Sequence, residues 1–513
     1  MSFLTSSSMR DFDARAVAAG TPGTVLMGRA CRGLAREFFS LCAGSRPSVL
    51  ICAGPGNNGG DGFGLAAHLH LAGWRTEVWV TSERARVGGD ALAYLQWAES
   101  VGVPLTFCPD PEDWPVEIGA LPCVDWVVDA VLGTGTGDAP RKTPAAAVAT
   151  LRALAADARV LAVDLPTGLD ADRGVPFDPE KCVRADATFT LGAAKAGFLA
   201  DASAYWTGPI TVIDLGFSPE ELAQASVQPI SVMHPARWAQ LNPRRDPESH
   251  KGTYGHVLVI GGSPGMTGAV AMSAKAALRS GAGLVSMFVP ASAMPFLDAA
   301  LPEIMVRGGR ETSEGTLAEQ KIDFSAYTAA VIGPGLGKNP ETAALLRQVF
   351  AECPIPLVVD ADALRLLADA WADSNDCPTP AAPRVLTPHP GEMAALCGCD
   401  TADVQSVRAE KCLEAAKKYQ SVVVLKGNRT RICFPNGDQW LNLNGNPGMA
   451  TGGSGDVLAG MLAGLLGRGL PPETAVPAAV YLHGRAGDRA AIRLGQDALT
   501  ALDLLLDGGF AFG

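Results

Sequence analysis

A glycine-rich segment near the C-terminus places one carboxylate where it could act on a phosphoryl group. The segment 444–460 reads NGNPGMATGGSGDVLAG, with the composition of a loop up to Gly455 and of an apolar helix after it. Glycines let backbone N–H groups approach an oxyanion closely, and a helix N-terminus attracts anions. Asp456 at the helix start would repel a phosphate. We therefore interpret it as an N-cap or as the base that deprotonates a hydroxyl attacking a phosphoryl group.

Three polar loops in the N-terminal half each follow a short apolar run. They read GPGNNGGDG at 54–62, GTGTGD at 133–138 and PTGLD at 166–170. Apolar runs that alternate with helical stretches indicate a parallel, doubly wound sheet, whose ligands lie at the carboxyl ends of the strands. Oxygen ligands suit a hard cation better than zinc, whereas capping of a turn is the alternative role for each residue alone. The side chains expected to converge are Asn58, Asp129, Asp164 and Thr167.

The motifs GPGNNGGDG, VVDAVLGTG and VDLPTGLDAD, in this order, resemble the epimerase domain of the bifunctional NAD(P)H-hydrate repair enzymes, over roughly residues 10 to 220. The resemblance implies that Asp164 lies near the nicotinamide ring and that Asn58, Asp129 and Thr167 hold a potassium ion. Inversion at a ring carbon calls for an acid or base beside it, and we expect Asp164 to be that group. Lys195 is either an electrostatic helper or, the favoured interpretation, a surface lysine. The implied substrate contacts are Asn57, Asn58, Gly59, Gly60, Asp61, Gly133, Thr134, Gly135, Thr136, Gly137, Asp138, Ala139 and Asp164.

A second set of polar motifs follows strand-like runs in the C-terminal half, so all of them can line one rim of a sheet. They are GGSPGMTGA at 261–269, GPGLG at 333–337, DADA at 360–363, TPHPGE at 387–392 and KGNRT at 426–430. With HKGTYGHVLVIGGS and GMATGGSGDVLAG they resemble the ribokinase-like superfamily. Within that superfamily, they resemble in particular the ADP- or ATP-dependent NAD(P)H-hydrate dehydratase branch.

This second resemblance also implies site residues. Asp456 would be the catalytic base, and the hydrated nucleotide would contact Ala269, Gly335, His389 and Asp456. Asp362 and Glu392 are metal-organising carboxylates or solvated loop acids, and an exposed imidazole in a rigid turn is the alternative for His389. ADP or ATP, with Mg²⁺ as the expected helper, would be held by Lys426, Gly427, Asn428, Arg429, Thr430, Gly452, Gly453, Ser454 and Gly455.

Size and charge limit the number of domains and the kinds of partner to expect. The 513 residues exceed the ~250–300 at which one core stops growing. We therefore expect a Rossmann-like epimerase domain at 1–226 and a ribokinase-like dehydratase domain at 227–513. A net charge of −12 without a basic run disfavours nucleic acid or an anionic membrane as partner. Scattered cysteines indicate reduced thiols rather than zinc. With no signal peptide and no long apolar run, we expect a cytoplasmic protein, assembled as a homo-oligomer.

The sequence therefore predicts an enzyme that interconverts the R and S forms of hydrated NAD(P)H. It would then dehydrate the S form at the expense of ADP or ATP, releasing phosphate. The alternative is a ribokinase-like kinase for a small alcohol or vitamin precursor, fused to a Rossmann-like binding domain without catalytic activity. That alternative leaves the N-terminal half without a reaction.

Overall fold

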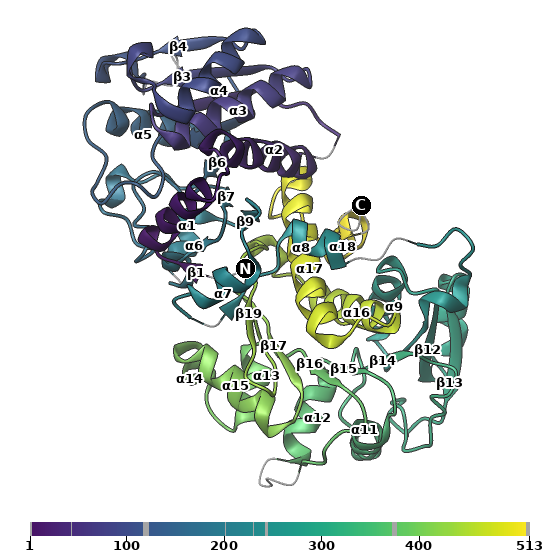
Figure 1. Cartoon of the computed structure of the whole chain (residues 1–513). Coiled ribbons are helices and arrows are strands. Elements are labelled where there is room, and N and C mark those ends of the chain that lie inside the picture. The colour runs from purple at the N-terminus through teal and green to yellow at the C-terminus, as the bar shows by residue number, and fades with distance from the viewer. Residues whose placement is uncertain are drawn as a thin grey trace. The chain divides into compact units, whose positions relative to one another are not determined.

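The computed structural model describes residues 3–42, 44–115, 123–200, 202–228, 230–241, 245–371 and 377–508. The chain forms two compact units, Met1–Arg237 and Trp238–Gly513 (Figure 1). The division falls within α8 (Pro235–Leu241).

The first unit is built on a seven-stranded sheet with the order β4-β3-β2-β5-β6-β7-β9, in which all neighbouring strands run parallel. Counted along the chain, its first six strands have the order 3-2-1-4-5-6 of dinucleotide-binding folds, with the topological switch point between β2 and β5. The strands are β2 (Val49–Ala53), β3 (Thr76–Val80), β4 (Leu105–Phe107), β5 (Trp126–Ala130), β6 (Arg159–Val163), β7 (Ala187–Leu191) and β9 (Ile210–Ile213).

Helices cover both faces of this sheet because successive strand residues point to opposite sides. Leu50 and Cys52 of β2 share a core with α5 (Thr143–Leu154). Ile51, between them, faces Gly62 of α3 (Asn57–Leu71) on the other side. The predicted doubly wound arrangement is therefore confirmed. The other elements of this unit are β1 (Phe3–Leu4), α1 (Ser6–Ala18), α2 (Gly23–Leu41), α4 (Gly89–Ser100), β8 (Ala194–Lys195), α6 (Ser203–Thr207), α7 (Pro219–Gln224) and β10 (Ile230–Ser231).

The second unit repeats this strand order in a mixed sheet. From β13 through β12, β11, β14, β15 and β16 to β17 the neighbours are parallel, and β18 and β19 add an antiparallel edge. Its switch point lies between β11 and β14. The strands are β11 (His256–Ile260), β12 (Leu284–Pro290), β13 (Met305–Gly309), β14 (Ala329–Ile332), β15 (Leu357–Val359), β16 (Arg384–Leu386), β17 (Val422–Leu425), β18 (Arg431–Cys433) and β19 (Gln439–Leu441).

Two helices, α9 (Thr267–Arg279) and α16 (Ser454–Gly467), lie side by side over one face of the second sheet (Figure 1). A Cβ atom at Gly460 would lie 2.0 Å from the carbonyl oxygen of Ser273, so glycine permits this close approach. The opposite face carries α11 (Pro340–Glu352), α12 (Asp362–Ala370), α13 (Pro390–Cys397) and α15 (Arg408–Lys418). The other helices are α10 (Met294–Ala300), α14 (Thr401–Ser406), α17 (Pro472–Leu494) and α18 (Ala501–Gly508). The predicted class, two α/β domains built on parallel sheets, is confirmed.

Two consequences of the composition are visible in the folded chain. All twelve cysteines are free thiols, and most of them are buried. Within the described parts of the chain, no helix is long and apolar enough to cross a membrane.

Candidate active sites

Three of the predicted loops meet at the switch point of the first sheet. Asn57 and Asn58 begin α3 directly after β2, Gly133 follows β5, and Asp164 follows β6. A Cβ atom at Gly133 would lie 3.3 Å from Cβ of Asn58 and 3.4 Å from Oδ2 of Asp164. The two side chains therefore flank Gly133, and the three loops meet as the sequence predicted, at the switch point where sheets of this type have their crevice.

Two side chains in this crevice carry polar atoms that a cation could satisfy. The buried carboxylate of Asp129 accepts hydrogen bonds from N and Oγ1 of Thr167, both at 2.7 Å. Burial raises the pKa of Asp129 to about 6, and none of the described residues forms an ion pair with it. Both polar atoms of the Asn58 side chain are buried without a hydrogen-bond partner. These oxygen donors therefore fit a hard cation.

Lys195 lies inside the protein and contacts Asp164. Its exposed fraction is 1%, and its Nζ lies 2.7 Å from Oδ1 of Asp164. It also donates hydrogen bonds to the carbonyl oxygens of Leu191 and Ala193, at 2.9 and 3.2 Å. The interpretation as a surface lysine was wrong, because strand β1 pairs with β8 and covers this segment. Asp164 has a φ of 69°, an unfavourable backbone conformation of the kind that gathers at functional sites.

In the second unit, Asp456 occupies the first turn of α16 without capping it. The N-cap position belongs to Gly453, whose φ is 93°, so the N-cap alternative for Asp456 was wrong. No described residue donates a hydrogen bond to the Asp456 carboxylate. Burial, together with Asp360, raises its pKa to about 7, against the opposing effect of Lys426. A carboxyl group with that pKa is a competent general base at neutral pH.

Backbone N–H groups surround the start of α16. Ser454 N bonds to Thr451 O at 3.4 Å and Val457 N to Gly453 O at 3.0 Å. No described residue accepts a hydrogen bond from the N–H groups of Gly452, Gly453, Gly455 and Asp456. These donors point away from any protein acceptor, as in an anion site.

Lys426 stands next to this loop. Its Nζ lies 2.7 Å from Oδ1 of Asp360 and 3.9 Å from Oε2 of Glu392. A Cβ atom at Gly455 would be only 3.1 Å from that Nζ, so the missing side chain leaves room for the ammonium group. Sequence reasoning missed Asp360, which is buried. Asp360 could have been recognised as a site residue from its position directly after β15, at the same rim as the other motifs.

Glu392 is buried, so its interpretation as a solvated loop acid was wrong. Its Oε2 accepts a hydrogen bond from His389 N at 2.8 Å, and burial raises its pKa to about 7. The exposed His389 imidazole uses Nδ1 to accept from Gly391 N at 3.0 Å, which caps α13. In a neutral ring the proton is then on Nε2, 3.4 Å from Oε1 of Glu392. His389 is thus a turn residue whose Nε2 lies beside the Glu392 carboxylate.

The glycine loops after β11 and β14 meet at the second switch point. Ser263 N donates to Gly335 O at 2.6 Å, and Gly337 N donates to Oδ2 of Asp362 at 3.1 Å. Asp362 therefore orders the GPGLG loop and is not a free surface acid. Ala269 lies in the first turn of α9. In the KGNRT motif, Thr430 Oγ1 donates to Gly427 O at 2.9 Å.

A second buried acid anchors the start of the glycine-rich segment. Asp488 of α17 accepts from Gly445 N and from Nδ2 of Asn446, both at 3.0 Å. Sequence reasoning missed this residue. A lone carboxylate inside the helical stretch HGRAGDRAA was its signal.

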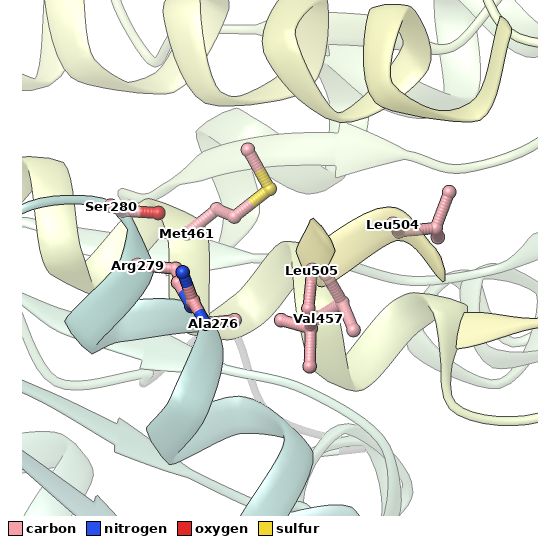
Figure 2. A pocket seen from close by; sticks show the side chains of 7 residues that line it. All are labelled: Ala276, Arg279, Ser280, Val457, Met461, Leu504 and Leu505. Atoms are coloured by element: carbon pink, nitrogen blue, oxygen red, sulfur yellow. The ribbon is translucent and has the colours of Figure 1, made fainter. Parts of the chain in front are cut away.

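A small apolar pocket borders α16, and none of these carboxylates lines it (Figure 2). Its walls come from α9, α16 and α18 and include none of the predicted site residues. It is lined by Ala276, Arg279, Ser280, Val457, Met461, Leu504 and Leu505.

The shape of the glycine loop gives a first prediction. Gly453→Ala puts a side chain at a φ of 93° and 2.5 Å from Cε of Met272. The strain should cost about 1–3 kcal/mol and displace the N–H groups. We expect kcat/KM of the second site to fall about 100-fold, because misplacement of about 1 Å has effects of that size. The reaction of the first unit is the internal control, and near-normal activity of the second site would contradict the prediction.

The pKa of Asp456 gives a second prediction. Below pH about 7 the carboxyl group is protonated and cannot act as a base. The kcat/KM of the second site should therefore rise about tenfold per pH unit at acidic pH and level off above about 7. Glu392 has a similar pKa, so the profile of Glu392→Gln is the control and should keep its inflection. A rate that falls with rising pH in this range would exclude Asp456 as the base.

The two crevices define a class of enzyme: two α/β domains, each with glycine loops and carboxylates at its switch point. Family models for a YjeF-related protein N-terminus and for NAD(P)H-hydrate dehydratase match residues 23–197 and 257–506. The bifunctional NAD(P)H-hydrate repair enzyme Nnr of Moorella thermoacetica is 40% identical over 94% of this chain and 91% of its own length. The Coxiella burnetii enzyme of the same name is 35% identical over 97% and 96%.

The chain therefore belongs to the family of bifunctional NAD(P)H-hydrate repair enzymes. Among solved structures, an ADP/ATP-dependent NAD(P)H-hydrate dehydratase of Bacillus subtilis co-crystallised with ATP/Mg²⁺ is 34% identical. That match has a TM-score of 0.48 and covers 54% of this chain and 96% of the other. The family predicted from the motifs is confirmed, and the kinase alternative is not favoured.

Proposed function

We propose that the chain repairs hydrated NAD(P)H in two steps. The first domain, assigned to residues 1–226, interconverts the R and S hydrates. The second, assigned to 227–513, dehydrates the S hydrate at the expense of ADP or ATP and releases phosphate. The proposal is supported chiefly by a relative that is 40% identical over 94% of this chain and is named a bifunctional NAD(P)H-hydrate repair enzyme.

In the second domain, Asp456 takes the proton of the ring hydroxyl as that oxygen attacks the terminal phosphoryl group. The free N–H groups of the loop stabilise charge on the phosphoryl oxygens, and the ammonium group of Lys426 adds to this effect. The C–O bond then breaks, phosphate leaves, and loss of the proton on the neighbouring ring carbon restores the dihydronicotinamide. The hydrate would contact Ala269, Gly335 and His389, and the adenine nucleotide would contact residues 426–430 and 452–455.

Metal ions fit both domains. A potassium ion held by Asn58, Asp129 and Thr167 would connect three loops and supply a positive counter-charge for the Asp129 carboxylate. In the second domain, Asp362 is an oxygen donor suited to Mg²⁺ bound with the nucleotide, which would neutralise phosphate charge. In the first domain, Asp164 is the acid or base beside the nicotinamide ring, and Lys195 holds its carboxylate in an ion pair.

A mixture of the R and S hydrates tests the proposal. With ADP, the purified chain should convert both epimers to reduced coenzyme and release phosphate in equal amount. Without ADP, it should only interconvert the epimers. A stable phosphorylated alcohol, with no reduced coenzyme, would instead support the kinase alternative.

A further inference from the structure

One carboxyl group in the first crevice has no partner of its own. Asp61 of α3 is 5% exposed. No described residue forms a hydrogen bond or a close ion pair with its carboxyl group. The ammonium group of Lys195 is held 2.7 Å from Asp164 instead. Ionisation of a buried carboxyl group without a partner costs free energy, so its presence here calls for a functional reason.

The position of Asp61 places it in the same crevice. It follows Asn58 by three residues in α3, so the two side chains lie on one face of the helix. Asn58 in turn flanks Gly133, next to Oδ2 of Asp164. The ionisable groups that influence Asp61 are Asp164, Asp13 of α1 and Lys195 of β8, while Cys31 of α2 and Tyr94 of α4 are themselves influenced by it.

We propose that Asp61 is the general acid of the epimerase site and works opposite Asp164. This inference rests on the proposed function. Enamine chemistry explains the need for an acid: hydration adds a proton to the ring's β-carbon and a hydroxyl to the carbon bonded to the ring nitrogen. That carbon can invert if its hydroxyl leaves and returns on the other face.

The step balances with the groups that are present. Asp61 gives its proton to the hydroxyl, the C–O bond breaks, and water departs as the nitrogen lone pair forms an iminium ion. The negative charge of Asp164 stabilises that cation. Water then adds to the opposite face, where Asp164 takes its proton. Exchange with solvent afterwards returns a proton to Asp61 and removes the one from Asp164. No oxidant or reductant is consumed.

The electrostatics agree with this assignment. Burial raises the pKa of Asp61 well above its usual value, Asp164 and Asp13 act in the same direction, and Lys195 opposes them. Burial thus favours the protonated form of Asp61, while the ammonium group of Lys195 lies beside Asp164. Two neighbouring carboxyl groups whose surroundings differ in this way are the pattern of an acid and its charged partner.

The test uses Asp61→Asn in the full chain, with epimerisation measured without ADP and corrected for the uncatalysed rate. We expect epimerisation to fall at least about 100-fold, as for loss of a general acid. Dehydration of the pure S hydrate with ADP should be unchanged. The melting temperature should hold or rise, because a desolvated acid has been removed. Epimerisation within about threefold of the wild type would overturn the assignment.

The pH profile of the wild-type enzyme keeps the proposal testable even if Asp61→Asn does not fold. Because the acid must be protonated, epimerisation should fall as pH rises through the raised pKa of Asp61. A rate that increases with pH throughout would overturn the proposal. Failure of the wild type to interconvert the hydrates would instead refute the proposed function itself.

Discussion

Asp456→Asn should dehydrate the S hydrate about 10³-fold more slowly than the wild type while it still binds ADP or ATP. The amide fills the same space but cannot take the proton of the attacking hydroxyl, and loss of a general base costs about 10²–10⁴ in rate. Nucleotide affinity should hold or increase, because Asp360, Asp362 and Glu392 already crowd this rim with negative charge. Single-turnover phosphate release and nucleotide titration measure the two effects separately.

The first domain supplies the control for this variant. Epimerisation by Asp456→Asn should match the wild type, which shows that the chain is folded. Retained dehydration would mean that Asp456 only shapes the helix start, and another group would have to be the base.

Asp164→Ala should abolish epimerisation and also weaken the first domain. Removal of the carboxylate leaves the buried Lys195 without its ion-pair partner, and breaking a buried ion pair in this way costs about 3–5 kcal/mol. We therefore expect a lower melting temperature for the unfolding of this domain. Dehydration of the pure S hydrate should persist, since none of its residues is altered.

Asp164→Asn separates chemistry from stability. The amide oxygen can still accept the hydrogen bonds that Leu191 N and Lys195 give to the carboxylate. This variant should lose epimerisation with a smaller loss of stability than Asp164→Ala. Normal epimerisation by either variant would refute the role of Asp164.

The crevices were predictable because parallel sheets collect loops at one edge. Asn58, Gly133 and Asp164 lie far apart in sequence, yet each directly follows an apolar run. The strand order then brings them together. Asp456 was recognisable for a different reason, as a charge between a glycine loop and an apolar helix.

The partners inside the sites were not predictable in the same way. The burial of Lys195 depends on pairing between β1 and β8, two residues each, whose register no local pattern encodes. The contact of Lys426 with Asp360 joins the ends of β17 and β15, and either acid of the DADA motif could have supplied it. The spacing of motifs predicts where strands end, whereas the pairing of two side chains depends on how the strands and loops pack against each other.

The most direct test of two crevices acting on one substrate starts from the pure R hydrate, with ADP present. The wild-type chain should convert all of it to reduced coenzyme and release one phosphate per coenzyme. With Asp164→Asn, the R hydrate should disappear only as fast as uncatalysed epimerisation allows. With Asp456→Asn, the reaction should end at a mixture of R and S hydrates. Reduced coenzyme formed from the R hydrate by Asp164→Asn at the wild-type rate would contradict the account.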